Sequence, residues 1–422
     1  MAKKDMDLYT RRWVVLASVG FLNNTNAFLW IAFAAVANHV NVFYGNSQAA
    51  NWFSLIFILC TIPVGIIAMW AASKFGLRAS LLIAAWANGI GTVIRFISSF
   101  VPQVLRFPVG ILGQGISACA YPFIMFLPTK VAGTWFADNE RTLATTIGVM
   151  ANPLGVLMAN LLSPQIVNSY NDVPKMNAIV MFPAIITCLL VTFGVNSSKP
   201  KTPPTLSAAV TQTDFLTGIK DCYSNKAYVI LAITLGGGIG MFNCLYTVIQ
   251  QLLCPSGYTN AFSGLCASLM IVGGLIGATA AGLFVDRTKL YEETLKVSYA
   301  FAVISGLLFL QLEYATYIAS FLFGVFGLAA YPVGLELSAE CTFPVPENLS
   351  TGFIVIVGQV SPFIITFLPA LLALLLILVF RPKLKRLQTE RKPVQEEQVL
   401  SAENCGPEGD VGKDVELSSG GL

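Results

Sequence analysis

The sequence predicts an all-α membrane protein built from two similar halves. Three observations predict this fold class: a very apolar composition, a series of long apolar stretches, and a polar linker that divides the series. Of the 422 residues, 55% are hydrophobic and only 11% are charged, whereas a soluble domain carries about 25% charged residues. The net charge of +3 is small and scattered, so the chain shows no surface typical of nucleic-acid binding.

The apolar stretches are long enough to cross a bilayer, which takes about 20 mainly apolar residues. The first half contains six of them, at residues 13–37, 52–72, 79–100, 107–127, 142–166 and 176–195. The second half has four further spans and a final block, at residues 227–253, 262–285, 295–312, 317–337 and 352–380. The basic N-terminus precedes a first stretch too long for a signal-peptide core, so we interpret that stretch as a membrane anchor.

The predicted domain layout follows from changes in composition. Residues 1–198 form an N-terminal six-helix bundle, and residues 199–225, rich in Pro, Ser, Thr and Lys, form a cytosolic linker. Residues 226–386 form a C-terminal helix bundle, and residues 387–422 form a disordered cytosolic tail.

The final apolar block does not fit two full spans. Residues 352–380 number 29, whereas two spans need about 40 residues and a turn. One span would put the basic segment 381–392 outside the cell, against the preference of Lys and Arg for the cytosol. We therefore expect twelve helices with the last pair compressed or incomplete, eleven spans being clear, and parts of the last two helices absent from this version of the chain.

The direction of insertion follows from the placement of Lys and Arg. With the N-terminus in the cytosol, the outer segments carry only Arg106 and Lys175. The predicted cytosolic segments carry Lys3, Lys4, Arg11, Arg12, Lys74, Arg78, Arg141, Lys199, Lys201, Lys220, Lys226, Arg287, Lys289 and Lys296.

Enzyme chemistry and metal binding are not predicted. His39 is the only histidine, and the nine cysteines form no C-x-x-C pair. Metal and haem ligation and histidine acid–base catalysis need more than this, and no nucleophile and base are paired. We expect no cofactor, no metal and no enzymatic activity.

The two halves repeat a short basic turn at the same position. SKFGLR (73–78) follows the second span and GLFVDRTK (282–289) follows the eighth. Two similar halves of a helical membrane protein commonly enclose a site at mid-membrane and rock against each other, which indicates a transporter. The second turn reads G-x-x-x-D-R, and an Asp at that helix end can meet a helix N-terminus or an Arg across the halves.

We therefore predict a gating role for Asp286, Arg287 and Glu336, against the alternative of a simple loop cap. Ser73 stands where the first turn would need Asp, so a one-sided contact is expected.

The stretch GFLNNTNAFLW (20–30) is unusually polar for a membrane span. At about 100° per residue, Asn23, Asn26 and Trp30 share one face of a helix. Asn243, Tyr246 and Gln250 repeat that spacing on the seventh helix. We predict that both stripes line a central cavity. The alternative is that an Asn merely bonds a neighbouring helix, which we prefer for Asn24.

Several motifs resemble those of one known family. NAFLW (26–30), ANPLGVLMAN (151–160), NKAYVILA (225–232), FSGLC (262–266), VDRTK (285–289) and GLELSAECTFP (334–344) are similar to the feline leukaemia virus subgroup C receptor-related family, solute carrier family 49. That family lies within the major facilitator superfamily, whose loop signature the G-x-x-x-D-R turn resembles. The resemblance covers residues 9 to 390 and implies a two-bundle facilitator fold with twelve helices.

The resemblance also implies a substrate site. Members thought to carry choline use an Asn and a Trp on helix one, matching Asn26 and Trp30, and a Gln on helix eleven, matching Gln359. This chain departs from them at Tyr121, where a Gln is expected, and at Asn243, where a Tyr is expected. These matches, the two stripes and the quoted motifs together give the predicted substrate-binding residues Asn26, Trp30, Tyr121, Asn152, Asn243, Tyr246 and Gln359.

The expected function is facilitated transport of a small organic solute, choline-like or another amine. No Asp or Glu lies near the middle of a span to hold a proton. Arg95 and Lys130 are expected to extend toward the membrane surfaces. A haem or porphyrin carrier and a non-transporting receptor or scaffold remain alternatives. The expected partners are the solute and the lipid bilayer, without nucleic acid, and we expect a monomer in the plasma membrane rather than in an organelle.

Overall fold

The computed structural model describes residues 10–253, 260–311 and 316–364, and every regular element within these ranges is a helix. The first half contains α1 (Arg11–Ile31), α2 (Ala37–Tyr44), α3 (Ala49–Lys74), α4 (Gly76–Ile97), α5 (Gln103–Trp135), α6 (Arg141–Ile166) and α7 (Val173–Gly194). After two short helices, α8 (Leu206–Ala209) and α9 (Phe215–Ser224), the second half contains α10 (Lys226–Leu253), α11 (Asn260–Thr288), α12 (Tyr291–Gln311), α13 (Thr316–Thr342) and α14 (Glu347–Ile364).

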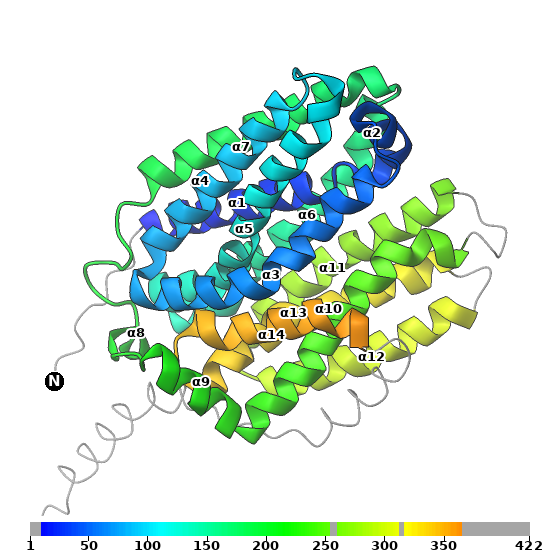
Figure 1. Ribbon diagram of the computed structural model, residues 1–422. Helices are drawn as coiled ribbons and strands as arrows, with labels where there is room; N and C mark the ends of the chain where they lie inside the picture. Colours follow the sequence, from blue (N-terminus) through cyan, green and yellow to red (C-terminus); the bar gives the residue numbers. More distant parts are fainter. Residues whose placement is uncertain (1–9, 254–259, 312–315, 365–422) are drawn as a thin grey trace, which may run out of the picture.

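The helices pack mainly with partners from their own half of the chain. In the first half, α4 packs on α5 and α7, α1 on α6, and α3 on α5. In the second half, α13 packs on α11 and α12, and α10 on α14. Figure 1 shows α1 to α7 in the upper left and α10 to α14 in the lower right, with α8 and α9 at one end of the molecule. The two groups meet along α6, α11 and α13 and along α3, α5 and α14.

The apolar helices confirm a multi-pass membrane protein, but not the predicted number of spans. Within the described residues, eight helices are long and apolar enough to cross a membrane. A ninth span results if α9 and α10, which meet at an angle of 88°, count as one. The expected total of eleven or twelve stays a prediction: α12, at the predicted span 295–312, is not among these helices, and the block at 352–380 lies mostly outside the described residues.

Two predicted spans differ from the helices observed. The first ends at Ile31, and a 3₁₀ turn and α2 continue the chain to Tyr44 instead of one helix to residue 37. The fourth, predicted at 107–127, becomes the 33-residue α5, which contains three prolines. Neighbouring helices allow a membrane helix to keep internal prolines. Hydrophobicity located both spans, but it could not locate their ends.

Small residues bring α11 and α13 close together. A Cβ on Gly277 would collide with the backbone carbonyl of Val325, and one on Gly324 with that of Met270. The backbones therefore approach more closely than any other residue would allow. Gly273 and Gly277, which are four residues apart on one face of α11, therefore serve helix packing.

The expectation that Arg95 and Lys130 reach the membrane surfaces is wrong, because both are buried. Arg95 donates hydrogen bonds to the carbonyl oxygen of Leu29 and to the side-chain oxygens of Gln114 and Asn177, at 2.8–3.0 Å. Its guanidinium also lies 3.6 Å from the centre of the Phe33 ring. The helices therefore supply polar partners inside the bundle, and Arg95 ties α1, α4, α5 and α7 together.

Candidate functional site

A cavity lies between the two halves, midway along the long helices. The first half contributes one part of its lining, namely Trp30, Tyr121, Met125, Asn152, Pro153 and Val156. The polar and aromatic part of the lining from the second half is Phe242, Tyr299, Phe323, Tyr331 and Gln359. None of the lining residues that the structure describes is charged. A cation in this cavity would therefore meet aromatic faces and neutral dipoles.

The indole of Trp30 is held in place from three sides. Its ring N–H donates a hydrogen bond of 3.1 Å to the carbonyl oxygen of Ser54 on α3. Its ring stacks on Phe57, with ring centres 6.0 Å apart, and lies 5.9 Å from Tyr121. Since the N–H group already has a partner, the indole offers the cavity its aromatic surface, which attracts cations.

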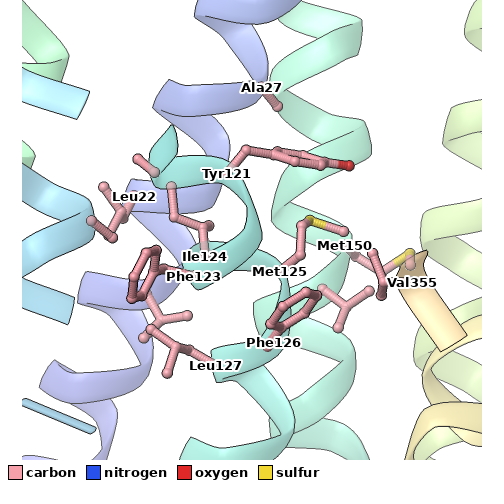
Figure 2. Close-up of a cluster of buried hydrophobic side chains, with 14 of the residues drawn as sticks. Leu22, Ala27, Tyr121, Phe123, Ile124, Met125, Phe126, Leu127, Met150 and Val355 are labelled. Atoms are coloured by element: carbon pink, nitrogen blue, oxygen red, sulfur yellow. The ribbon is translucent and has the colours of Figure 1, made fainter. Parts of the chain in front are cut away.

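Tyr121 and Gln359 join the two halves inside the cavity. The Gln359 amide on α14 donates a hydrogen bond of 3.3 Å to the Tyr121 hydroxyl on α5. In Figure 2 the Tyr121 hydroxyl and Met125 point toward the side of α5 on which Val355 of α14 lies, whereas Phe123 lies toward Leu22 of α1. The family resemblance implies a Gln at the position of Tyr121. In this protein the tyrosine at that position contacts Gln359, which matches the family's Gln on helix eleven.

Asn152 presents an amide oxygen to the cavity. Its amide nitrogen donates a hydrogen bond of 3.0 Å to Asn23 Oδ1 and contacts the Met125 sulfur at 3.7 Å. Asn23 in turn donates to the carbonyl oxygen of Gly148 at 2.9 Å. These two hydrogen bonds fix the orientation of the Asn152 amide. The amide oxygen remains an acceptor for an ammonium N–H or a hydroxyl group.

Two of the predicted cavity residues on helix one lie behind the cavity wall. Asn26 is fully buried and donates hydrogen bonds to Asn88 Oδ1 at 2.9 Å and to the carbonyl oxygen of Ser117 at 3.1 Å. Asn23 bonds α6, as described above. The expectation that both line the cavity is therefore wrong, since polar side chains within the bundle found partners on neighbouring helices. Asn24 donates to the carbonyl oxygen of Ala151, as predicted.

The stripe predicted on helix seven is not tested. Asn243 and Tyr246 lie on α10, but their side chains fall outside the described residues. The aromatic residues that the structure does bring to this side of the cavity are Phe242 and Phe323, which stack with ring centres 5.7 Å apart.

A second site joins the two halves at the end of the helices predicted to be cytosolic. Asp286, at the end of α11, accepts hydrogen bonds from the backbone N–H groups of Thr142 and Leu143, at 2.9 and 2.8 Å. These amides belong to the first turn of α6, where the helix dipole favours a negative charge. A Cβ on Gly282 would lie 2.8 Å from Thr146 Oγ1, so glycine permits the close approach. Arg287 is exposed and makes no ion pair with a described residue.

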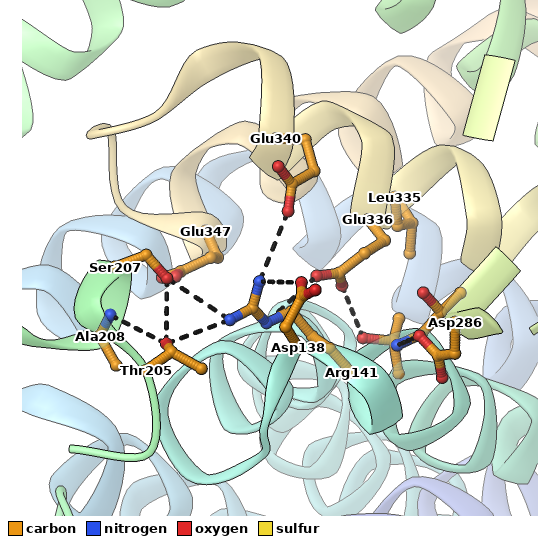
Figure 3. A network of polar contacts seen from close by, with 12 residues as sticks. Asp138, Arg141, Thr205, Ser207, Ala208, Asp286, Leu335, Glu336, Glu340 and Glu347 are labelled. Atoms are coloured by element: carbon orange, nitrogen blue, oxygen red, sulfur yellow. Dashed lines mark hydrogen bonds and ion pairs between the residues drawn. The ribbon is translucent and has the colours of Figure 1, made fainter. Parts of the chain in front are cut away.

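Arg141 forms the centre of a buried charge network across the halves (Figure 3). Its guanidinium lies 3.5 Å from Glu340 and 3.9 Å from Glu336, both on α13 and both buried. Glu336 also accepts a hydrogen bond of 3.0 Å from the Thr145 hydroxyl on α6. The structure therefore brings the predicted gating residue Glu336 to the interface, together with Arg141 and Glu340, which the sequence analysis did not select.

The linker between the halves joins the same network. Arg141 donates hydrogen bonds to the hydroxyl groups of Thr205 and Ser207, at 3.2 and 3.4 Å. Asp138, in the turn before α6, pairs with Arg141 at 3.4 Å and with Lys289 at 3.0 Å. Glu336 and Glu340 lie four residues apart and so share one face of a helix. This spacing is the feature of the sequence that could have indicated a buried cation opposite them.

A further contact between the halves joins α3 and α5 to the start of α14, and the expectation of a one-sided gating contact stays a prediction. Asn348 donates hydrogen bonds to the carbonyl oxygen of Met69 at 3.0 Å and to Ser73 Oγ at 3.2 Å. Lys130 donates to Asn348 Oδ1 at 3.1 Å and to the carbonyl oxygen of Ala72 at 2.6 Å. The contact is made by the Asn348 side chain in the first turn of α14, and it needs no carboxylate at position 73.

Comparison with known proteins gives a consistent assignment. The sequence profile of the Major Facilitator Superfamily matches residues 14–342. Solute carrier family 49 member A3 of Xenopus tropicalis is 39% identical over 369 residues, which cover 84% of this chain and 76% of that protein. Choline/ethanolamine transporter FLVCR2 of Homo sapiens is 31% identical over 377 residues, covering 84% and 71%.

Solved structures resemble the fold. The proton:xylose symporter XylE matches with a TM-score of 0.69 and 13% identity, over 91% of this chain and 99% of that one. The transporter FucP in its outward conformation matches with a TM-score of 0.67 and 12% identity, over 85% and 96%. At these identities the likeness extends to the fold alone.

Proposed function

We propose a substrate and a mechanism from the premise that this chain belongs to the Major Facilitator Superfamily of transporters and, within it, to solute carrier family 49. The substrate is a small amino alcohol or a related amine of the choline and ethanolamine class. It binds in the central cavity and moves down its gradient as the two halves rock about it. Relatives named as choline/ethanolamine transporters, about a third identical, support this class.

The uncharged aromatic cavity is the observation that carries the proposal. Trp30 presents its ring and Tyr121 lies beside it, and an indole face attracts a desolvated cation by about 0.5–2 kcal/mol. Asn152 and Gln359 add amide groups, and Tyr331 adds a hydroxyl. A large anionic porphyrin has no cationic partner among these lining residues, and the only imidazole, His39, lies outside the lining.

In the proposed mechanism the structure corresponds to a state closed on the cytosolic side. The contacts of Asp286 with α6 and of Asn348 with α3 hold that side shut. Separating the halves there exposes Arg141, Glu336 and Glu340 to water, which offsets part of the cost of breaking their pairing. Among the described residues that line the cavity there is no carboxylate that could hold a coupled proton, which supports facilitated rather than proton-driven transport. We also propose a plasma-membrane location.

Uptake of labelled choline and ethanolamine into proteoliposomes tests the proposal. Uptake should saturate, should persist when the proton gradient is collapsed, and should fall severalfold or more with Trp30→Ala. Trp13→Ala is a matched control, because Trp13 lies at the cytosolic end of α1, where its ring contacts Phe136. Uptake of both amines that is indifferent to Trp30→Ala would reject the cavity as their site.

A further inference from the structure

The short helix α9 lies across the cytosolic end of the second half. It meets α10 at an angle of 88°, so when α10 crosses the bilayer, α9 runs roughly along the membrane surface. One face of α9 packs on the protein: Gly218 and Cys222 are buried, and Gly218 approaches Leu349 of α14 so closely that a Cβ would lie 2.8 Å from its methyl group. Its position relative to α14 is thereby fixed.

The apolar surface of α9 continues beyond the face that is packed. Leu216 is 77% exposed and Tyr223 is 60% exposed. At about 100° per residue, both project from the same flank of the helix, beside the buried face. Two large apolar side chains with this exposure are unexpected on a water-covered helix of ten residues, and they are typical of a helix that lies in a membrane interface.

The contacts of Tyr223 show which way this flank faces. Its ring meets the ring of Phe353 edge-on, with centres 5.3 Å apart. Phe353 lies nearly two turns inside α14, one of the long helices that surround the cavity. The flank that carries Leu216 and Tyr223 therefore faces along α14 toward the bilayer rather than away from it.

One basic side chain borders the same flank, and a second lies two residues beyond the end of α9. Lys220 follows Leu216 by one helical turn and is exposed, as is Lys226 at the start of α10. Asp221 lies about 100° further round the helix than Lys220, on the side away from Leu216. The cytosolic leaflet carries anionic lipid, which attracts Lys and Arg close to its surface. The charges next to the apolar flank therefore complement that leaflet.

Hydrogen bonds connect α9 and its flanks to the turn between α13 and α14. Thr213 N–H donates to the carbonyl oxygen of Pro344 at 3.3 Å. Gln212 donates to Glu347 at 2.8 Å, and Asn225 donates to the carbonyl oxygen of Cys341 at 3.0 Å. This turn lies between Glu340 and Asn348, two members of the cytosolic contacts. A shift of α9 would therefore move the α13–α14 turn, and with it the helices that carry the cytosolic contacts.

We propose that α9 binds anionic lipid of the inner leaflet, with Leu216 and Tyr223 among the acyl chains and Lys220 and Lys226 at the phosphates. The bound lipid holds α9 against the α13–α14 turn and so stabilises the closed cytosolic side. This inference does not depend on which solute the cavity carries.

Hydrogen–deuterium exchange of the full-length chain in lipid nanodiscs tests it without a transport assay. One set of nanodiscs contains phosphatidylcholine alone, and the other contains one third phosphatidylserine. Amide exchange in residues 213–225 should be severalfold slower with phosphatidylserine. Lys220→Gln with Lys226→Gln should remove this protection, to which each lysine contributes at most about fivefold. Leu216→Ser should speed exchange in both lipids.

The matched control is Lys199→Gln with Lys201→Gln, which removes the same charge from exposed positions of the linker outside α9. This variant should keep the full protection. Equal exchange in the two lipids, or equal loss of protection in the control, would overturn the proposal. All four lysines are exposed, so neither double variant removes a packed side chain.

Discussion

The Gln359 amide donates a hydrogen bond of 3.3 Å to the Tyr121 hydroxyl, and the two residues belong to opposite halves of the chain. This bond crosses the cavity in which we propose that the solute binds. The Gln359 side chain keeps a second N–H and its oxygen for a solute, whereas rocking of the halves breaks its bond to Tyr121. Substitutions of the two residues should therefore distinguish two effects: the contribution of Gln359 to solute binding, and the contribution of the bond to the stability of the closed state.

Gln359→Ala and Tyr121→Phe should affect transport differently. Gln359→Ala removes an amide from the site, and loss of one hydrogen bond of about 0.5–1.5 kcal/mol should raise the KM about twofold to tenfold. Tyr121→Phe keeps the ring beside Trp30 and frees Gln359, so the KM should stay within about twofold while the maximal rate rises. Initial rates of amine uptake measure both. A KM that rises equally in both variants would contradict direct contact between solute and Gln359.

Asp286→Ala should loosen the cytosolic contact between α11 and α6. Hydrogen bonds to a charged group contribute about 1.5–3 kcal/mol, so the amides of Thr142 and Leu143 should exchange hydrogen about tenfold to a hundredfold faster. Mass spectrometry of peptides covering residues 141–147 measures this exchange. Arg287→Gln is the control, since Arg287 is exposed beside Asp286, and it should leave these amides unchanged. Unchanged exchange in Asp286→Ala would remove Asp286 from the proposed gate.

The sequence predicted the apolar helices, the membrane class and the family motifs, because these depend on composition and local spacing. It also predicted that Asp286 meets a helix N-terminus or an Arg across the halves, and the structure has the first. It could not decide which side of helix one faces the cavity. Asn23, Asn26 and Trp30 share an arc wide enough to reach both the cavity and the neighbouring helices, and only tertiary packing places Asn88 beside Asn26.

The charge network was hidden for a related reason. Arg141 and Glu340 are 199 residues apart, so no local pattern pairs them. Each lies near a helix end, where a charge is ordinarily solvated. Arg141 and Glu340 are buried because α6 and α13 pack against each other at these helix ends. That contact depends on packing along the whole interface between the halves.

Arg141→Met should destabilise the protein more than loss of an exposed pair does. It removes the guanidinium that faces Glu336 and Glu340, and breaking one side of a buried ion pair costs about 3–5 kcal/mol. The double variant Arg141→Met, Glu340→Gln should recover part of the loss. Lys289→Gln breaks a partly exposed pair with Asp138 and should cost about 1 kcal/mol or less. Thermal unfolding in detergent, followed by intrinsic fluorescence, ranks the variants; equal Tm values would contradict a buried network.

Tyr331 and Tyr299 form a matched pair in the cavity lining. The Tyr299 hydroxyl donates a hydrogen bond of 2.9 Å to the carbonyl oxygen of Thr234. The Tyr331 side chain is only 8% exposed, and no described residue hydrogen-bonds its hydroxyl. A buried hydroxyl without a partner is costly, so a ligand in the cavity would gain by hydrogen-bonding Tyr331. We propose that it recognises the hydroxyl group of an amino alcohol.

Tyr331→Phe should therefore weaken recognition without weakening the fold. The KM for choline and ethanolamine should rise about twofold to tenfold, the effect of one hydrogen bond, while propyltrimethylammonium, which lacks the hydroxyl, should compete for uptake as well as before. Thermal stability should stay the same or increase, because an unpartnered buried group is removed. Tyr299→Phe should show the opposite pattern, with a lower Tm and little selectivity change, since its lost bond is internal. If Tyr331→Phe weakens choline and propyltrimethylammonium equally, Tyr331 shapes the cavity and does not read the hydroxyl.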